Sequence, residues 1–196
     1  MKGVEIMEYR NATVEDISAV SLLQKKYHIS TISEIDKPHG FVTTLFSEKQ
    51  FKDLIEKENG LAIACDGGKV IAYAMAASWE FWAKWPLFET MINDLPNTTY
   101  QNRILSVENS YQYGPICIDK EYRGTEVLPN IFEFSRQQMK DRFPILITFI
   151  NQINHRSFHA HTVKLGLDVI KPFDFNGNHY FELGFDTSNK TSGSNI

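Results

Sequence analysis

Residues 119–130, with the sequence DKEYRGTEVLPN, have the composition of a phosphate-binding loop at the start of a helix. They follow an apolar stretch, and Pro129 suits the first turn of a helix, where a missing N–H is tolerated. Backbone N–H groups at a helix start attract anions. Gly124 allows the backbone to approach a ligand closely, and Arg123 can add charge-assisted hydrogen bonds. We therefore expect residues 123–128 to bind a phosphate group.

Glu126 opposes this interpretation, because it places a carboxylate where a phosphate would lie. At an effective dielectric of about 20 to 40 and a separation of roughly 7 Å, the repulsion is about 1 to 2 kcal/mol per charge pair. A ligand with micromolar affinity binds with about 8 kcal/mol. Glu126 would then weaken binding without abolishing it. A carboxylate here also stabilises the helix dipole, so an ordinary strand–turn–helix junction is the alternative.

Gly114 and Pro115 interrupt the apolar segment QYGPICI that leads into this loop. Proline lacks an N–H and occurs in sheets at edges or bulges. The pair predicts a bulge at which pairing with the buried strand FPILITFIN fails, with an edge strand as the alternative.

The composition is typical of a soluble globular domain: 196 residues, 42% hydrophobic, 22% charged and a net charge of -4. Such a charge provides no basic surface for nucleic acid. The opening MKGVEIMEYR lacks the apolar core of a signal peptide, and no apolar run approaches a membrane span. Cys65 and Cys117 lie in apolar runs and are interpreted as free thiols. We expect a cytoplasmic protein with neither a nucleic-acid nor a membrane partner.

The elements that must position the loop follow from hydrophobic periodicity and turn residues. The pattern predicts one α/β domain over residues 1–186, with a mixed, mostly antiparallel twisted sheet flanked by helices, and a disordered tail over 187–196. The expected strands and hairpins are 4–12, 61–78, 104–118, 143–151 and 167–185, and the expected helices are 13–27, 47–58, 128–142 and 155–166.

This order of elements, together with three local motifs, resembles that of the GCN5-related N-acetyltransferases, the GNAT superfamily. The resemblance covers almost the whole chain, up to about Asp186. Residues 122–124 are similar to the family's Tyr-Arg-Gly phosphate loop, in which Glu126 and Leu128 replace two glycines. A glycine-turn hairpin before the central strand is a second, weaker match.

The third motif is the helix that begins NHRSFHAHTVKLG. Asn154, Ser157 and residues 164–166 are similar to the family's Asn-x-x-Ser helix that ends in Lys-Leu-Gly, although the spacing is one residue longer. The resemblance implies that Asn154 binds pantetheine. A plain helix N-cap is an equally good interpretation of this residue, and the two roles are compatible.

The resemblance implies transfer of an acyl group, acetyl by default, from acetyl-coenzyme A to a primary amine by direct attack in a ternary complex. It also implies a splay between central strands 4 and 5 that admits pantetheine. No metal is expected. The cofactor-binding residues so implied are Ile116, Cys117, Ile118, Arg123, Gly124, Thr125, Glu126, Val127, Leu128, Asn154 and Ser157.

The catalytic residues are less well defined by sequence. Counting on from Ser157 places His161 where the family protonates the departing thiolate, whereas counting back from the Lys-Leu-Gly motif gives Thr162. Tyr113 and Glu108 are the candidates for a general base, and water can serve the same purpose.

The sequence allows three further interpretations. Cys117 could form an acyl-enzyme, but nothing near it in sequence activates the thiol. His155, His159 and His161 lack the additional ligands of a metal site. A catalytically degenerate GNAT fold that binds a ligand or partner is the alternative function.

The aromatic insert at residues 79–103 could line an acceptor pocket, form a homodimer contact or pack the core. Within it, Glu80 or Glu89 could meet a basic amine.

Overall fold

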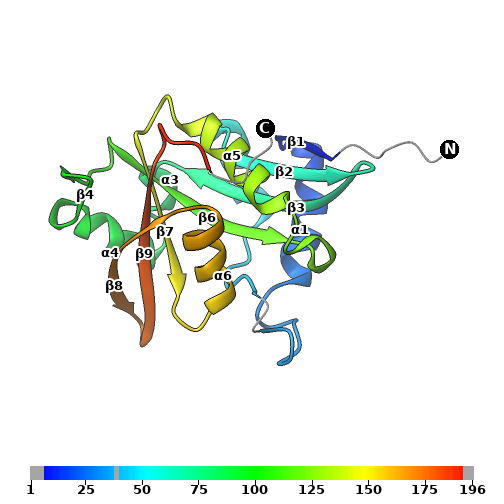
Figure 1. The fold of residues 1–196 in the computed structure, drawn as a ribbon. Coiled ribbons are helices and arrows are strands. Elements are labelled where there is room, and N and C mark those ends of the chain that lie inside the picture. The colour runs from blue at the N-terminus through cyan, green and yellow to red at the C-terminus, as the bar shows by residue number, and fades with distance from the viewer. Residues whose placement is uncertain (1–6, 38–39, 192–196) are drawn as a thin grey trace.

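The computed structural model describes residues 7–37 and 40–191. In this part of the chain, the central element is a seven-stranded sheet in the order β1-β2-β3-β6-β7-β9-β8 (Figure 1). All neighbouring strands are antiparallel except β6 and β7, which are parallel. The strands are β1 (Glu8–Asn11), β2 (Leu61–Asp66), β3 (Lys69–Ala77), β6 (Ser110–Ile118), β7 (Ile145–Asn151), β8 (Asp168–Phe175) and β9 (Asn178–Asp186).

Helices cover both faces of this sheet, and each face has its own hydrophobic cluster. The first face carries η1 (Val14–Asp16), α1 (Ile17–Lys26), α2 (Glu48–Asp53), η3 (Leu54–Glu58), α3 (Trp79–Trp82), α4 (Pro86–Asp94) and η4 (Leu95–Asn97). The second face carries α5 (Val127–Met139), α6 (His155–His159) and η6 (Ala160–Lys164). No helix in the described ranges is long and apolar enough to cross a membrane. The expected mixed α/β architecture is confirmed.

Side-chain size on β2 and β3 differs between the two faces. The strands present large residues such as Ile63 and Tyr73 to the first face. They present alanines to the second, namely Ala62, Ala64, Ala72, Ala74 and Ala76. Small side chains let a helix lie close to a sheet. Helix α5 packs on this alanine surface through Ile131 and Phe132, which fixes where its N-terminus lies.

Local capping and turn signals form as the sequence predicts. Ser47 Oγ accepts the Gln50 N–H at 3.3 Å, and Gln50 Oε1 accepts the Ser47 N–H at 2.8 Å, so both members of the capping box are satisfied. Gly67 and Gly68 have φ of 54° and 79° in the β2–β3 turn. Only glycine adopts such values readily, so the predicted hairpin is confirmed.

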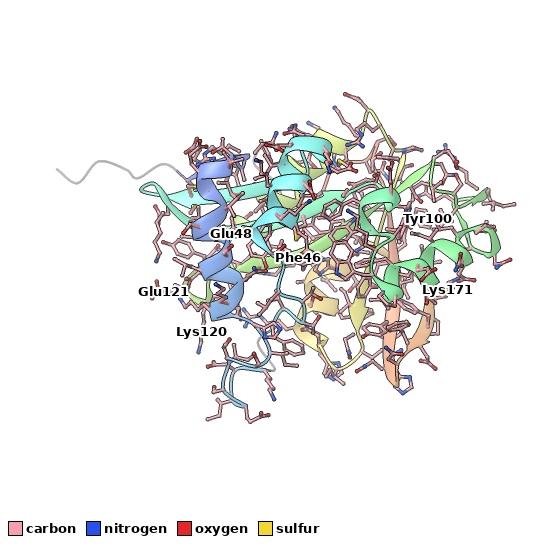
Figure 2. The ribbon with its side chains drawn as sticks, turned by 180° about the vertical axis from the view of Figure 1, so that it is seen from behind. Phe46, Glu48, Tyr100, Lys120, Glu121 and Lys171 are labelled. Carbon is pink, nitrogen blue, oxygen red and sulfur yellow. The ribbon has the colours of Figure 1, made fainter. Side chains whose placement is uncertain are left out.

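The aromatic insert folds as α3, α4 and η4, followed by a two-stranded sheet of β4 (Thr99–Tyr100) and β5 (Arg103–Ile104). Polar contacts tie it to β8: Tyr100 Oη donates to Asp168 Oδ2 at 2.7 Å, and Lys171 Nζ contacts Asp94. Figure 2 shows Tyr100 and Lys171 together at one end of the molecule, away from Lys120 and Glu121. The insert therefore lies beside the far end of the sheet.

Three expected boundaries were wrong. The first strand begins at Glu8, and the predicted residues 4–6 lie outside the described part of the chain. The central strand begins at Ser110, because residues 107–109 form a turn. The tail is ordered as far as residue 191: Thr187 Oγ1 donates to Phe143 O at 2.8 Å, and Arg136 donates to Thr187 O. Residues 192–196 are not described.

Candidate active site

A β-bulge in β6 lies where the sequence predicted it. Ile116 pairs with Ala74 of β3 and Tyr113 pairs with Ala76, so β6 uses one more residue than β3 over this interval. Gly114 supplies the necessary backbone conformation with φ of 103°. The bulge is confirmed, and the alternative of an edge strand is wrong because β6 lies in the middle of the sheet.

The parallel pairing of β6 with β7 joins Ser110–Gln112 to Ile145–Ile147. Beyond it, residues 114–118 and 148–151, all of which are described, share no ladder pair, and β7 continues only with β9. Cys117 is opposite Tyr73, and the Asp119 N–H bonds to Ile71 O at 2.8 Å. N–H directions alternate along a strand. The N–H groups of residues 117 and 119 point towards β3, so those of residues 116 and 118 point away from it. They face the side on which pairing with β7 has ended.

Two adjoining cavities occupy this region. The loop cavity has a volume of about 260 Å³ and the aromatic cavity about 370 Å³. The loop cavity lies beside Ile116–Ile118 and the start of α5. The aromatic cavity lies between the bulge, β7 and the start of α4. Both are lined by Phe41, Val42, Ile116, Asn154, Ser157 and His161.

The structure brings most of the implied cofactor residues together around the loop cavity. The residues that line it are Ile116, Cys117, Ile118, Arg123, Gly124, Thr125, Leu128, Asn154 and Ser157. Glu126 and Val127 do not. Val127, the first residue of α5, is buried in the core. Glu126 is exposed and lies near Tyr9, whose pKa is raised by burial and further by this carboxylate. The Glu126 carboxylate is therefore absent from the cavity wall.

The loop between β6 and α5 is held in shape by its own polar groups. Thr125 Oγ1 donates to Tyr122 O at 2.6 Å and accepts the Val127 N–H at 3.3 Å. The N–H groups of Gly124, Thr125 and Glu126 have no acceptor among the described residues. They remain available at the N-terminal end of the 13-residue helix α5.

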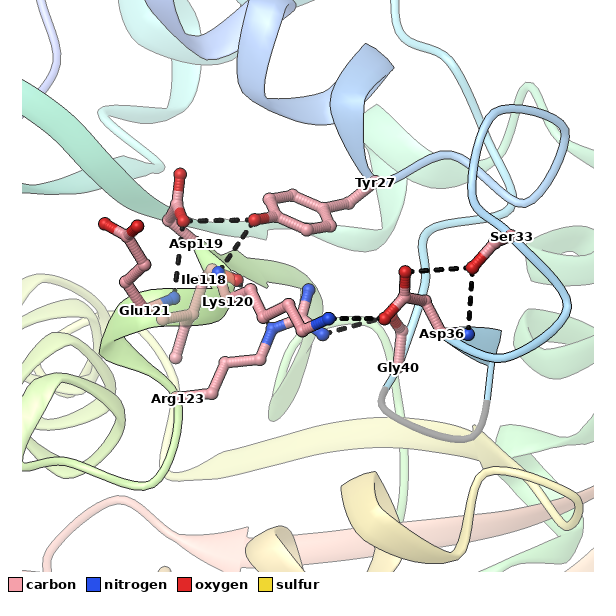
Figure 3. A network of polar contacts seen from close by, with 9 residues as sticks. All are labelled: Tyr27, Ser33, Asp36, Gly40, Ile118, Asp119, Lys120, Glu121 and Arg123. Carbon is pink, nitrogen blue, oxygen red and sulfur yellow. Dashed lines mark hydrogen bonds and ion pairs between the residues drawn. The ribbon is translucent and has the colours of Figure 1, made fainter.

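Arg123 is anchored to the protein backbone. Its Nε donates to Ile118 O at 2.8 Å and its Nη1 to Gly40 O at 3.4 Å, and its guanidinium lies 4.5 Å from the centroid of the Tyr27 ring (Figure 3). The guanidinium thus holds the segment at residue 40 against the loop. Its positive charge still lines the loop cavity, where it favours an anion.

Asp119 is the centre of a network that the sequence did not reveal. Its carboxylate accepts a hydrogen bond from Lys26 Nζ at 2.8 Å. It also accepts one from Tyr27 Oη at 3.0 Å, and Tyr27 Oη in turn accepts the Lys120 N–H at 2.7 Å (Figure 3). Burial alone would raise the pKa of Asp119, but these hydrogen bonds outweigh it and hold the pKa below its ordinary value. The network ties the end of α1 to the point where β6 becomes the loop. The only sequence signal was that Tyr27 ends an amphipathic helix.

Asn154 caps α6, as one of its two predicted roles requires. Its Oδ1 accepts the Ser157 N–H at 3.1 Å. Its Nδ2 has no acceptor among the described residues, and the side chain lines both cavities. The amide can therefore cap the helix and donate to a ligand, and its binding of pantetheine stays a prediction.

His161, and not Thr162, reaches the cavities. Residues 160–164 form a π-helical turn, which accommodates one extra residue. This explains the longer spacing in the sequence and favours the count from Ser157. Thr162 Oγ1 donates back to Phe158 O at 2.8 Å and lines neither cavity.

The His161 ring is 4% exposed and hydrogen-bonded in a way that defines its tautomer. Nδ1 lies 2.8 Å from Ser157 O, which can only accept, so Nδ1 carries the proton. Nε2 then carries the lone pair and has no partner among the described residues. Burial lowers the pKa of His161. The neutral ring therefore accepts a proton first, whereas the sequence predicted a donor.

Tyr113 and Glu108 are not suited to the predicted role of general base. Tyr113 is fully buried, with its ring centroid 6.4 Å from that of His161, and its hydroxyl has no partner. Burial raises its pKa far above the ordinary value, so the phenol stays protonated and cannot accept a proton as a general base. Glu108 lies exposed in the turn before β6 and lines neither cavity. Its placement on the strand was wrong.

Other predicted groups behave as ordinary structural residues. Burial raises the pKa of Cys117 to about 12, which keeps it a thiol and disfavours an acyl-cysteine. No group of three potential ligands for a metal ion occurs within residues 7–37 and 40–191. Glu80 and Glu89 are exposed and line neither cavity, so they are not placed to meet a basic amine.

The three tryptophans of the insert divide between two of the predicted roles. Trp79 and Trp82 are buried in the core. Trp85 and the neighbouring Phe88 line the aromatic cavity. The insert therefore packs the core with one part and forms a cavity wall with the other.

Comparison with known proteins gives the class of this fold. No family model and no curated protein matches the chain, whereas solved structures do. An acetyltransferase, yncA of Salmonella typhimurium, solved with acetyl-CoA, aligns with a TM-score of 0.62 and 9% identity over 97% of this chain and 99% of its own. A GNAT-family acetyltransferase of Streptococcus agalactiae aligns with a TM-score of 0.62 and 13% identity over 92% and 95%. The ribosomal-protein-S18-alanine N-acetyltransferase of Escherichia coli aligns with a TM-score of 0.60 and 11% identity over 97% and 99%.

The chain therefore has the fold of the GNAT N-acetyltransferases, as its motifs predicted. At sequence identities of 9 to 13%, the similarity to these structures establishes the fold alone. The substrate must be inferred from the site.

Proposed function

We propose that this protein is an acyl-coenzyme A-dependent N-acyltransferase, with acetyl as the default acyl group, that acts by direct attack of an amine in a ternary complex. One observation carries the proposal. A cavity that begins at the N-terminus of α5 meets a second cavity at His161, in the region where β6 and β7 are unpaired.

The donors along the loop cavity suit coenzyme A. The unpaired N–H groups of residues 124–126 can hold a diphosphate at the start of α5. Farther along, the N–H groups of Ile116 and Ile118 and Nδ2 of Asn154 can bind the amides of pantetheine. When bound, acetyl-coenzyme A supplies an activated acyl carbon and a thiolate leaving group.

His161 supports this mechanism because it lines both cavities and its Nε2 has no partner among the described residues. As the nitrogen–carbon bond forms and the carbon–sulfur bond breaks, Nε2 of His161 can accept the proton that the nitrogen releases. The resulting imidazolium can return that proton to the sulfur, so that one residue serves both needs. Tyr113, which remains a phenol, can donate a hydrogen bond beside it.

One observation favours a second candidate, a ligand-binding protein without turnover. Glu126 and Leu128 stand where the resembled phosphate loop has glycines, and the exposed Glu126 carboxylate lies at the N-terminus of α5. Such a protein would bind a ligand in the aromatic cavity without releasing coenzyme A.

The test follows the release of free thiol from acetyl-coenzyme A across a panel of amines, with calorimetry for binding of the cofactor itself. An enzyme gives amine-dependent thiol that falls in His161→Gln. The control is His155→Gln, an exposed histidine on α6 that lines neither cavity. Binding without thiol release by any amine would favour the second candidate, and no binding at millimolar cofactor would refute the proposal. A cytoplasmic location and a possible homodimer stay predictions.

A further inference from the structure

The aromatic cavity lacks a charged wall, which narrows the kind of amine that can occupy it. Among the described residues that line it there is no Asp, Glu, Lys or Arg, and His161 is the only side chain that titrates near neutral pH. The aromatic residues of the lining include Phe46, Trp85, Phe88, Phe149 and Tyr180.

The acidic residues nearest in sequence to this lining are unable to compensate a bound cation. Glu89 follows Phe88 but is exposed on α4, outside the lining. Asp174 precedes Phe175, is exposed, and is hydrogen-bonded to His179 at 2.6 Å. An ammonium group that entered the cavity would lose water without gaining an anionic partner, which is strongly unfavourable.

The walls are instead suited to a flat apolar body. The ring centroids of Phe46 and Trp85 are 5.6 Å apart, and Phe149 lies 5.6 Å from Phe88 and 5.5 Å from Tyr180. Aromatic rings at these separations pack favourably edge-to-face or offset. A cavity of about 370 Å³ with such walls can enclose a molecule the size of a substituted benzene.

We propose that the acceptor is a primary amine that is uncharged at neutral pH and attached to an aromatic ring. This inference rests on the proposed function and names its substrate class. An uncharged amine needs no prior deprotonation: its lone pair forms the bond to the acyl carbon while the carbon–sulfur bond breaks. The proton that the nitrogen then loses passes to His161 and on to the sulfur.

The experiment compares two amines of similar shape that differ in charge at pH 7. Aniline is uncharged and benzylamine is a cation. Ligand-observed NMR titration of each into the protein without coenzyme A measures binding alone. We expect aniline to bind at least tenfold more tightly than benzylamine. Equal or tighter binding of benzylamine would overturn the proposal, and this comparison needs no variant.

A parallel thiol-release assay with aniline separates the two levels of inference. Binding of aniline without thiol release would refute the acyltransferase proposal and leave the ligand class intact. Release with benzylamine but not aniline would leave the enzyme intact and refute the ligand class.

Discussion

The Ser157 carbonyl determines which nitrogen of His161 faces the site. A carbonyl oxygen only accepts hydrogen bonds, so the proton resides on Nδ1, and Nε2 presents its lone pair. Because burial lowers the pKa, the ring is uncharged near neutral pH. The backbone contact therefore determines which nitrogen can accept a proton, and burial lowers the pH range in which the ring is neutral.

Replacing His161 should impair turnover but leave cofactor binding intact. General acid–base catalysis typically contributes about 10² to 10⁴ in rate, and we expect His161→Gln to lower kcat by a factor in this range. The Kd of acetyl-coenzyme A, measured by calorimetry, should change less than twofold. A variant with unchanged kcat would show that water, and not His161, carries the proton.

The pH profile provides a separate test of the same residue. The neutral base is present above its pKa and is lost as the pH falls through it. Because the His161 pKa is lowered from its ordinary value of 6.5, the acid limb of kcat/KM should lie below pH 6.5, with a plateau above it. Stopped-time assays from pH 5 to 9 measure it. The acid limb of the kcat/KM profile should be absent in His161→Gln. An acid limb centred above pH 7 would contradict the assignment of His161 as the base.

Glu126 should have only a small effect on cofactor affinity. Its carboxylate is exposed and outside the loop cavity, so solvent and salt screen its repulsion of a diphosphate. Calorimetry on Glu126→Gln should show acetyl-coenzyme A binding strengthened by less than about tenfold, which corresponds to about 1.4 kcal/mol, and the gain should shrink at high salt. Glu89→Gln is the matched control, because it removes the same charge on α4. A loss of affinity in Glu126→Gln would imply that the carboxylate supports the loop.

At the scale of elements, the junction between β6 and α5 depends on α1. Asp119 accepts hydrogen bonds from Lys26 and Tyr27 while almost fully buried. We expect Asp119→Asn to lower the free energy of unfolding by about 1 to 3 kcal/mol, the usual cost of disrupting hydrogen bonds to a buried charged group. Urea denaturation measures it. Tyr27→Phe serves as a partial control, since it removes the hydroxyl but retains the ring beneath Arg123.

The pH dependence of this stabilisation has a definite sign. The folded pKa of Asp119 is lowered, so its contribution is complete above the unfolded value of about 3.9 and declines as the pH falls through the folded value. The difference between wild type and Asp119→Asn should stay constant from pH 7 to 5 and narrow only in stronger acid. A difference that narrows near pH 6 would point to another titrating group.

Structural features that depend on residues adjacent in the chain could be predicted from the sequence. Features that depend on contacts between distant segments could not. The capping box at Ser47, the hairpin at residues 66–69 and the bulge at Gly114 each follow from residues adjacent in the chain. The sequence showed that the spacing between Ser157 and Lys164 is one residue longer than in the resembled motif. It did not show that a π-helical turn accommodates the extra residue. The ordered tail depends on Arg136, about 50 residues earlier, and periodicity cannot reveal such contacts.

The same division applies to the candidate site. Motif residues such as Gly124 and Asn154 were found because backbone geometry constrains residue type at those positions. The aromatic cavity was not, since Phe46, Trp85 and Tyr180 come from three separate segments that meet only in the folded chain. The roles of Tyr113 and His161 depended on burial, which changes proton affinity without changing the sequence motif.

At the scale of the molecule, the two faces of the sheet position different parts of the candidate site. The second face carries α5 on its alanine surface and so fixes the start of the loop. The first face, rich in aromatic residues, extends through Phe88 to Phe149 at the wall of the aromatic cavity. The unpaired region between β6 and β7 joins the two, which is why one histidine can lie beside both cavities.

Because the loop cavity draws on β6, α5 and α6 together, its ligand should stabilise the whole chain. At about 100 times its Kd, acetyl-coenzyme A should add roughly 2.7 kcal/mol. For a domain of this size that corresponds to a rise in Tm of about 5 to 10 °C. Differential scanning fluorimetry measures it, and His161→Gln should show the same rise, because that variant loses chemistry and not the cofactor. A rise that appears only in Glu126→Gln would mean that the charge abolishes binding in the natural chain. No rise in either protein would mean that the fold no longer binds the cofactor.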